Sequence, residues 1–144
     1  PTADRTRLDG FERAVATFHL GATILPDDTG RDLAAFGRTA AEQWLTLRRR
    51  PTAVQAYSDE LAMGFLALMH ARGIRVPDDV AVVGFDDRRF AALAWPPLST
   101  VAQPNAETGA LAASILLERI RGENAPRGGW SRTVPTRLIV RASA

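Results

Sequence analysis

The sequence predicts an α/β fold, a doubly wound parallel sheet, and three observations support this prediction. Short apolar runs alternate with longer segments in which apolar residues recur at helical spacing. Strands separated by helices of this length indicate βαβ units, which have parallel strands and right-handed crossovers. A chain of 144 residues, of which 46% are hydrophobic and 24% charged, can bury a substantial core as one domain or one lobe.

The first half of the chain is predicted to contain three helices and two strands. Glycine follows the first and third helices, at Gly21 and Gly73, where it favours a C-terminal cap. The second helix ends near Pro51, because the residue before a proline disfavours the helical conformation. In order, the predicted elements are helix 3–19, strand 22–25, a turn over 26–30, helix 33–47, strand 53–57 and helix 59–72.

The second half continues the alternation with one long irregular stretch, which runs through Pro97 and separates two strands. Pro104 stands at a favoured first-turn position of the following helix, and Gly122 ends that helix. A loop rich in glycine and arginine then leads to the last extended segment. The predicted elements are strand 80–83, strand 99–102, helix 104–121 and an extended segment over 134–141.

The run from Val80 to Asp87 is the most informative stretch, because a buried strand ends there in a glycine, an aromatic residue and two carboxylates. Ligands of open α/β sheets bind beyond the carboxyl ends of the strands, where Asp86 lies. Its carboxylate could accept two hydrogen bonds from neighbouring hydroxyls of a sugar or ribose, or it could cap the following turn. Adjacent strand residues point to opposite faces, so Asp86 and Asp87 are not expected to share an acid–base or metal site.

The sequence lacks the motifs of common enzyme classes, and no cofactor or metal is predicted. It contains no glycine-rich dinucleotide or phosphate loop and no nucleophile elbow. His19 and His70 fall late in predicted helices without metal-ligand spacing to a partner, which favours surface or helix-terminal histidines. Cysteine is absent, which excludes disulfides and thiolate metal sites. These observations predict a protein that is not an enzyme.

Composition also argues against a membrane protein and against direct DNA binding by this chain. No window is long and apolar enough to span a membrane, and no signal peptide is recognised. All basic residues are arginines, and the net charge is only +2. The single basic cluster, 48–50, ends a predicted helix, where it either stabilises the helix dipole or binds phosphate. Because the first residue is Pro1, we expect a piece of a longer protein.

Four blocks resemble the effector domain of lactose-repressor (LacI/GalR) family transcription regulators: 51–64, 80–87, 96–104 and 135–143. The resemblance implies a periplasmic-binding-protein-like type I lobe, with 1–144 as the C-terminal part of the effector-binding and dimerisation domain. The helix-turn-helix headpiece and most of the N-terminal lobe would lie outside this chain. A cytoplasmic repressor of this kind is a homodimer that binds a small sugar-like effector and contacts operator DNA through its headpiece. The alternative is a secreted sugar-binding protein of the same fold that serves a transporter or chemoreceptor.

The resemblance also implies a set of effector-binding residues. Asp86 matches the acidic residue of the family's effector cleft, and Arg7 matches an arginine that reaches the effector. Ser58 stands where the family commonly has asparagine, and serine is equally suited to capping the next helix. Near 28–32 the family often has an aromatic residue; Arg31 or Asp32 replaces it here, and Asn105 replaces another. These departures favour an effector more polar than a simple hexose.

A dimer interface is implied by the same resemblance, through the loop at Trp95 and the helix that starts near Asp59. Met63 and Leu66 are expected on the outward face of that helix, although residues with such spacing are also typical of a core. The residues expected to face the sheet instead are Leu61, Ala62, Phe65 and Leu68 or Met69.

Overall fold

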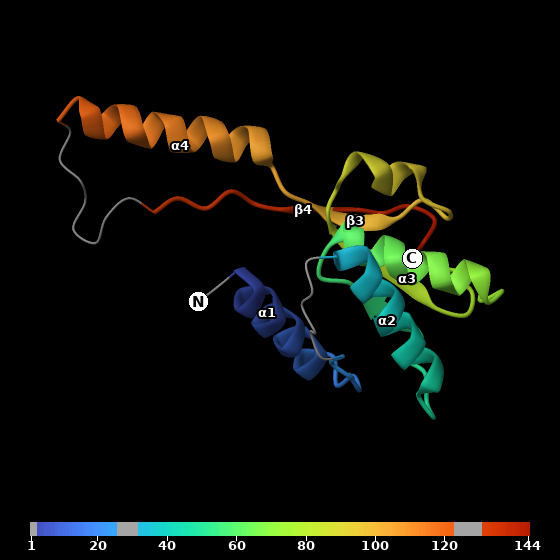
Figure 1. The fold of residues 1–144 in the computed structure, drawn as a ribbon. Coiled ribbons are helices and arrows are strands. Elements are labelled where there is room, and N and C mark those ends of the chain that lie inside the picture. The colour runs from blue at the N-terminus through green and yellow to red at the C-terminus, as the bar shows by residue number, and fades with distance from the viewer. Residues whose placement is uncertain (1–2, 26–31, 123–130) are drawn as a thin grey trace.

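The computed structural model describes residues 3–25, 32–122 and 131–144. Its elements alternate between helix and strand much as the sequence predicts (Figure 1). The predicted turn over 26–30 and Arg31 lie outside the described residues. The elements are α1 (Ala3–Thr17), α2 (Leu33–Thr46), β1 (Ala53–Gln55), α3 (Asp59–Ala71), β2 (Ala81–Asp86), the 3-10 helix η1 (Arg89–Leu93), β3 (Ser99–Ala102), α4 (Asn105–Ile120) and β4 (Arg137–Ile139).

The strands form one mixed sheet in the order β1-β2-β3-β4. The first three are parallel, with Val54 beside Val82 and Gly84 beside Thr100, which confirms the predicted α/β class. β4 is antiparallel to β3, so the sheet is not parallel throughout. Figure 1 shows how this arises. α4 leads the chain away from the sheet, and the segment after it runs back toward the sheet, so β4 runs opposite to β3.

The predicted strand over 22–25 is wrong. Residues 21–25 are described and form neither helix nor strand, and the side chain of Ile24 is 53% exposed. In the described sheet β1 pairs with β2 alone, so the segment has no partner strand, although the outer edge of β1 is open. An apolar run without such a partner cannot become part of a sheet.

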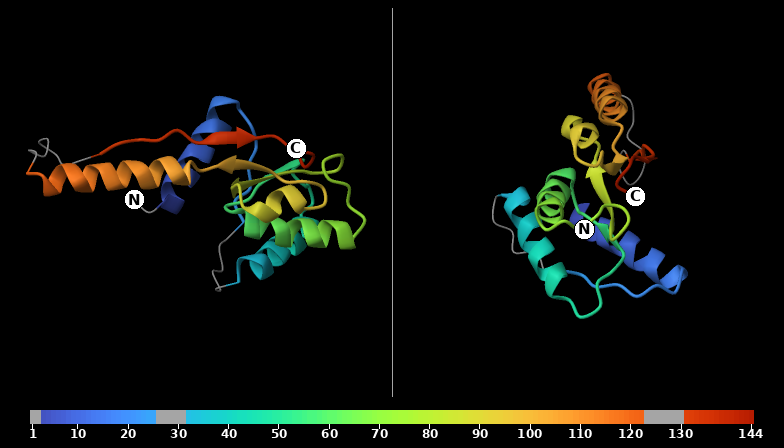
Figure 2. Two further views of the ribbon diagram at one scale, coloured as in Figure 1. Left: turned by 90° about the horizontal axis from the view of Figure 1, so that it is seen from above. Right: turned by 90° about the vertical axis from the view of Figure 1, so that its right-hand side faces the viewer.

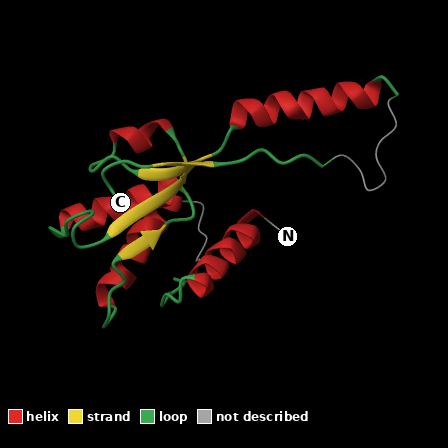
Figure 3. Cartoon of the chain, turned by 180° about the vertical axis from the view of Figure 1, so that it is seen from behind, coloured by secondary structure: helices red, strands yellow, loops and turns green. Residues whose placement is uncertain are grey.

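The core lies between the sheet and the helix pair α2 and α3, and Figure 3 shows the strands in front of these two helices. Along β2, Val82 and Gly84 are buried, whereas the other residues of the strand are partly exposed. Trp44 of α2 meets Phe65 of α3 edge-to-face, with ring centroids 6.1 Å apart. The two helices therefore form the layer that covers one face of the sheet.

The predicted outward position of Leu66 is wrong, because its side chain is only 3% exposed. α3 is enclosed on more than one side: α2 packs against it, and the segment carrying Ile74 and Val76 packs against the same core. Met63 is half-buried against the core as well. Trp95, in contrast, is 78% exposed.

Ser143, near the end of the chain, forms hydrogen bonds with both β2 and β3. Ser143 is fully buried, and its hydroxyl donates to the Val82 carbonyl at 2.6 Å while accepting from the Ser99 N–H at 2.8 Å. The Val82 N–H donates to the Ser143 carbonyl at 2.7 Å. One serine thus satisfies polar groups of two neighbouring strands where water cannot reach them.

α4 extends away from the sheet, as Figure 1 and the left view of Figure 2 show. None of its residues is buried, and its apolar side chains Leu116, Leu117 and Ile120 are 58%, 51% and 71% exposed. Arg132 of the returning segment approaches Glu118 of the helix at 3.7 Å. Among the described residues, no helix has the length and apolar character needed to cross a membrane.

Titration of Asp79 tests the ion pair between Asp79 and Arg75 in the turn before β2. Both carboxylate oxygens accept hydrogen bonds from the Arg75 guanidinium, at 2.6 and 3.0 Å, which lowers the pKa of Asp79 from 3.8 to about 2. Because the folded pKa lies below the unfolded one, this interaction stabilises fully above pH 3.8 and is lost as the pH falls toward 2. We expect a carboxyl NMR titration midpoint near 2 that rises in Arg75→Gln. A wild-type midpoint near 4 would contradict the interaction.

Candidate functional site

The carboxyl ends of the three parallel strands meet at one edge of the sheet, where ligands of open α/β folds bind. β2 runs on to Asp86, beyond the predicted strand end at Val83. Tyr57 follows β1 and Gln103 follows β3, so both arrive at the same edge as Asp86. We call this the carboxyl edge.

Arg7 of α1 reaches the carboxyl edge from a distant part of the sequence. Its guanidinium donates to the Tyr57 carbonyl at 2.8 Å. The guanidinium carbon lies 4.0 Å from the centroid of the Tyr57 ring and 4.6 Å from that of Phe85. Both distances are within the range of cation–π attraction, so two aromatic rings and a carbonyl fix the direction of the charged group. Sequence reasoning missed Tyr57, although a lone tyrosine just after a strand was a usable signal.

Asp86 follows Phe85, whose ring Arg7 contacts. Its Oδ1 accepts a hydrogen bond from the Gln103 side-chain amide at 2.6 Å, and its backbone has a positive φ of 111°. Asp87 turns to different partners: its carboxylate pairs with Arg141 at 2.7 Å. The two carboxylates therefore occupy separate environments, as the sequence predicts.

Three further predicted residues begin helices. Ser58 caps α3, its hydroxyl accepting the Leu61 N–H at 3.3 Å, and it is buried. Asp32 caps α2 by accepting the Ala35 N–H at 2.8 Å. Asn105 is the first residue of α4 and is exposed. The structure thus gives Ser58 and Asp32 a capping role, and their contact with an effector stays a prediction.

Asp59 is a fully buried carboxylate behind the carboxyl edge, and sequence reasoning gave it no role. It accepts the Thr100 hydroxyl at 2.5 Å and the Arg88 N–H at 2.7 Å. Burial raises the pKa of Asp59 above 3.8, and the two hydrogen bonds offset part of this increase. The sequence does not single out Asp59, because it lies in the first turn of a predicted helix, where acidic residues are common.

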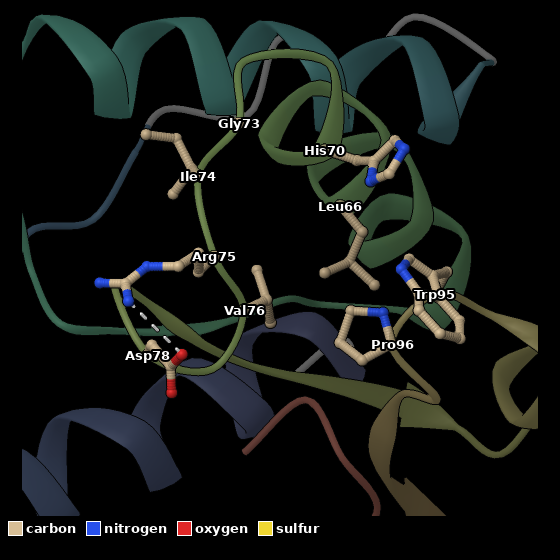
Figure 4. Close-up of a pocket in the computed structure, with 9 residues that line it drawn as sticks. All are labelled: Leu66, His70, Gly73, Ile74, Arg75, Val76, Asp78, Trp95 and Pro96. Atoms are coloured by element: carbon tan, nitrogen blue, oxygen red, sulfur yellow. Dashed lines mark ion pairs between the residues drawn. The ribbon is translucent and has the colours of Figure 1, made fainter.

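A hollow of about 440 Å³ lies at the opposite end of β2 (Figure 4). It is bordered by Leu66 and His70 of α3, by the segment from Gly73 to Asp78, and by Trp95 with Pro96. Because this segment leads into the start of β2, whereas Asp86 is the last residue of that strand, the hollow does not coincide with the predicted effector site. Within the described residues, no group of acidic or histidine side chains is arranged to hold a metal ion.

A family model described as a periplasmic binding protein-like domain matches residues 1–144. The transcriptional repressor PurR of Vibrio cholerae is 37% identical over 128 residues, covering 87% of this chain and 37% of that protein. The repressor CytR of Escherichia coli is 35% identical over 139 residues, covering 95% of this chain and 40% of that protein.

A solved structure extends this similarity to three dimensions. The LacI family regulator of Lactobacillus casei with bound sucrose superposes with a TM-score of 0.74 at 33% identity. The match covers 97% of this chain and 51% of that one. The chain therefore spans about two fifths of the curated relatives it matches and about half of this solved neighbour.

Proposed function

The chain belongs to the LacI/GalR family of transcription regulators, as part of its periplasmic-binding-protein-like effector domain, and we propose that it binds a small polyhydroxylated effector at the carboxyl edge. One observation supports this site most directly. Arg7 stacks on Phe85, the residue before Asp86, so a hydrogen-bond donor and an acceptor are brought to the same edge of the sheet.

The chemistry of these groups suits a sugar or a related metabolite. A carboxylate accepts hydrogen bonds from adjacent hydroxyls, and a guanidinium donates to hydroxyl, carboxylate or phosphate oxygens. Tyr57 is 41% exposed and Arg7 covers one face of its ring, so we propose that a sugar ring packs against the other face. We propose that Ser58, Asp32 and Asn105 make further polar contacts with the effector. These additional polar residues favour an effector with more polar groups than a simple hexose.

We further propose that effector binding controls operator DNA through parts of the protein outside this chain. The exposed apolar residues of α4 are suited to packing against a second lobe, which the greater length of the relatives would supply. Closure of two lobes around an effector would shift the population between operator-binding and released states of a cytoplasmic repressor. The relatives are named as repressors, which favours this function over secreted transport.

Operator binding by the full-length protein tests this proposal. We would select an operator from random DNA and measure its affinity by fluorescence anisotropy with sucrose, hexoses, pentoses and nucleosides. At least one compound should change operator affinity by about 5- to 150-fold, the usual range of allosteric coupling. An operator affinity that no polyhydroxylated compound alters would contradict the proposed control.

The 144-residue chain on its own should show no sequence-specific DNA affinity. Its net charge of +2 provides only weak attraction for phosphates. Among the arginines of the 48–50 cluster, Arg50 donates to the Leu45 carbonyl and lies over Trp44, which fits a helix-terminal role. A gel-shift titration at physiological salt checks this. Submicromolar, sequence-dependent binding would show that the chain itself reads DNA.

We propose that full-length subunits form a two-fold dimer through the loop at Trp95 and the nearby part of α3 that carries Met63. Leu93 and Trp95 are 85% and 78% exposed, and a two-fold axis would place this apolar patch against its own copy. Replacing both with aspartate should convert the dimer to a monomer in analytical ultracentrifugation. Leu66 is left unchanged because it is buried and its replacement would disturb the core. A double variant that still sediments as a dimer would place the interface elsewhere.

A further inference from the structure

The buried carboxylate of Asp59 lies behind a turn with unusual backbone geometry. Asp86 and Asp87 have φ values of 111° and 51°, a region that non-glycine residues rarely adopt and that costs conformational energy. Two such residues in succession persist only where the surrounding structure holds them. Hydrogen bonds on both sides of this turn therefore hold Asp86 in its conformation.

Two backbone groups of the turn are held through Asp59. The Arg88 N–H donates directly to its Oδ2 at 2.7 Å. The Asp87 N–H approaches the Thr100 hydroxyl at 3.4 Å, and that hydroxyl donates to Asp59 Oδ1 at 2.5 Å. A single carboxylate thus receives one hydrogen bond from the turn and is linked to another through one hydroxyl.

The strand next to Asp59 leaves room for its side chain. Gly84 pairs in register with Thr100, and a Cβ atom added at Gly84 would collide with Asp59 Oδ1. Any larger residue at Gly84 would therefore displace the carboxylate from the turn. Burying a charge in this place opposes folding, since desolvation disfavours the ionised form. An apolar residue would avoid that cost but would leave the Arg88 N–H and the Thr100 hydroxyl without this acceptor.

We propose that Asp59 is a positioning residue, which sets the direction of the Asp86 carboxylate by fixing the 86–88 turn from behind. The inference rests on the proposed effector site at Asp86. Asp59 itself contacts no effector, because it is fully buried. The ion pair between Asp87 and Arg141 holds the same turn from the side of the C-terminal tail, where Arg141 also donates to the Leu98 carbonyl at 2.7 Å.

The test uses two pairs of variants of the full-length protein. Asp59→Ala removes both acceptors, whereas Asp59→Asn keeps one oxygen for the Arg88 N–H and an amide that can donate to Thr100. Thr100→Val removes the hydroxyl at nearly constant volume, and Thr100→Ser retains it. Each variant is measured without ligand by amide hydrogen exchange, and by calorimetry with whichever sugar the wild type binds among sucrose, hexoses and pentoses.

In Asp59→Ala, we expect the Arg88 amide to lose at least tenfold in protection relative to Val82, whose N–H is held by Ser143. Sugar affinity should fall at least tenfold as well. Asp59→Asn should keep most of the Arg88 protection, and Thr100→Ser should behave like the wild type while Thr100→Val loses Asp87 protection.

Equal loss of protection at Arg88 and Val82 would show a merely structural role and overturn the inference, as would unchanged protection in Asp59→Ala. Should that variant fail to fold, Thr100→Val decides instead, because it cuts the link between Asp59 and the Asp87 N–H: unchanged Asp87 protection and unchanged sugar affinity relative to Thr100→Ser would overturn the inference. The exchange measurement needs no ligand, so it judges the positioning role even where the proposed function fails. That second failure has its own signature, which is wild-type sugar affinity in Asp86→Ala.

Discussion

Replacing Gly64 with alanine is expected to destabilise the fold by about 3 kcal/mol, at the upper end of the usual cost of overpacking. A Cβ atom at Gly64 in α3 would collide with the backbone carbonyl of Ala34 in α2. The contact is reciprocal, since a Cβ at Gly37 would collide with the Leu61 carbonyl. Backbone atoms cannot rotate aside as a side chain can, so the helices would have to separate. Urea denaturation measures the loss as a lower midpoint at an unchanged m-value.

Gly109→Ala is the matched control in another helix. It lies within α4, and a Cβ there would meet nothing within 4 Å. Because alanine favours helix over glycine by about 0.5–1 kcal/mol, this variant should be slightly more stable than the wild type. Equal tolerance of alanine at Gly64 and Gly109 would contradict the close crossing of α2 and α3.

Removing either charged group of the carboxyl edge is expected to weaken effector binding by about ten- to a hundredfold. Loss of a charged hydrogen-bond partner costs about 1.5–3 kcal/mol, which corresponds to that range of affinity. Asp86→Ala deletes the proposed acceptor, and Arg7→Ala deletes the proposed donor together with its stacking on Tyr57 and Phe85. Operator affinity without effector should stay nearly unchanged, since the proposed DNA-binding headpiece is separate from the carboxyl edge. Calorimetry of the full-length protein measures the first quantity, and anisotropy the second.

Matched substitutions at the other end of β2 control for unspecific effects. Asp78→Ala removes an exposed carboxylate beside the hollow, and Arg72→Ala removes an exposed guanidinium after α3. Neither should alter effector affinity. Wild-type affinity in both Asp86→Ala and Arg7→Ala would mean that the effector binds elsewhere.

Local patterns in the sequence were enough to predict most of the fold. Periodic apolar residues located α2 and α3, and an apolar run ending in two carboxylates located β2 and its functional end. The prediction failed where an element depends on distant neighbours. Residues 22–25 look like a strand but lack a partner, and the direction of β4 depends on where the chain returns after α4.

The candidate site shows the same limit. The position of Asp86 at the end of a strand is enough to predict it as a site residue. The orientation of Arg7, in contrast, depends on Tyr57, fifty positions along the chain. Such a contact leaves no local pattern in either segment, and the resemblance to a family was needed to single out Arg7. Leu66 was misplaced because spacing on α3 cannot reveal that other segments enclose that helix from several sides.

Mapping the effector on the full-length protein by NMR distinguishes binding at the carboxyl edge from binding at the hollow, because the two lie at opposite ends of β2. With a sugar that alters operator binding, we predict the largest amide shift changes at Tyr57, Phe85 and Asp86. Residues around the hollow should change little. The largest changes at Leu66, Val76 and Trp95, with the carboxyl edge unaffected, would contradict the account.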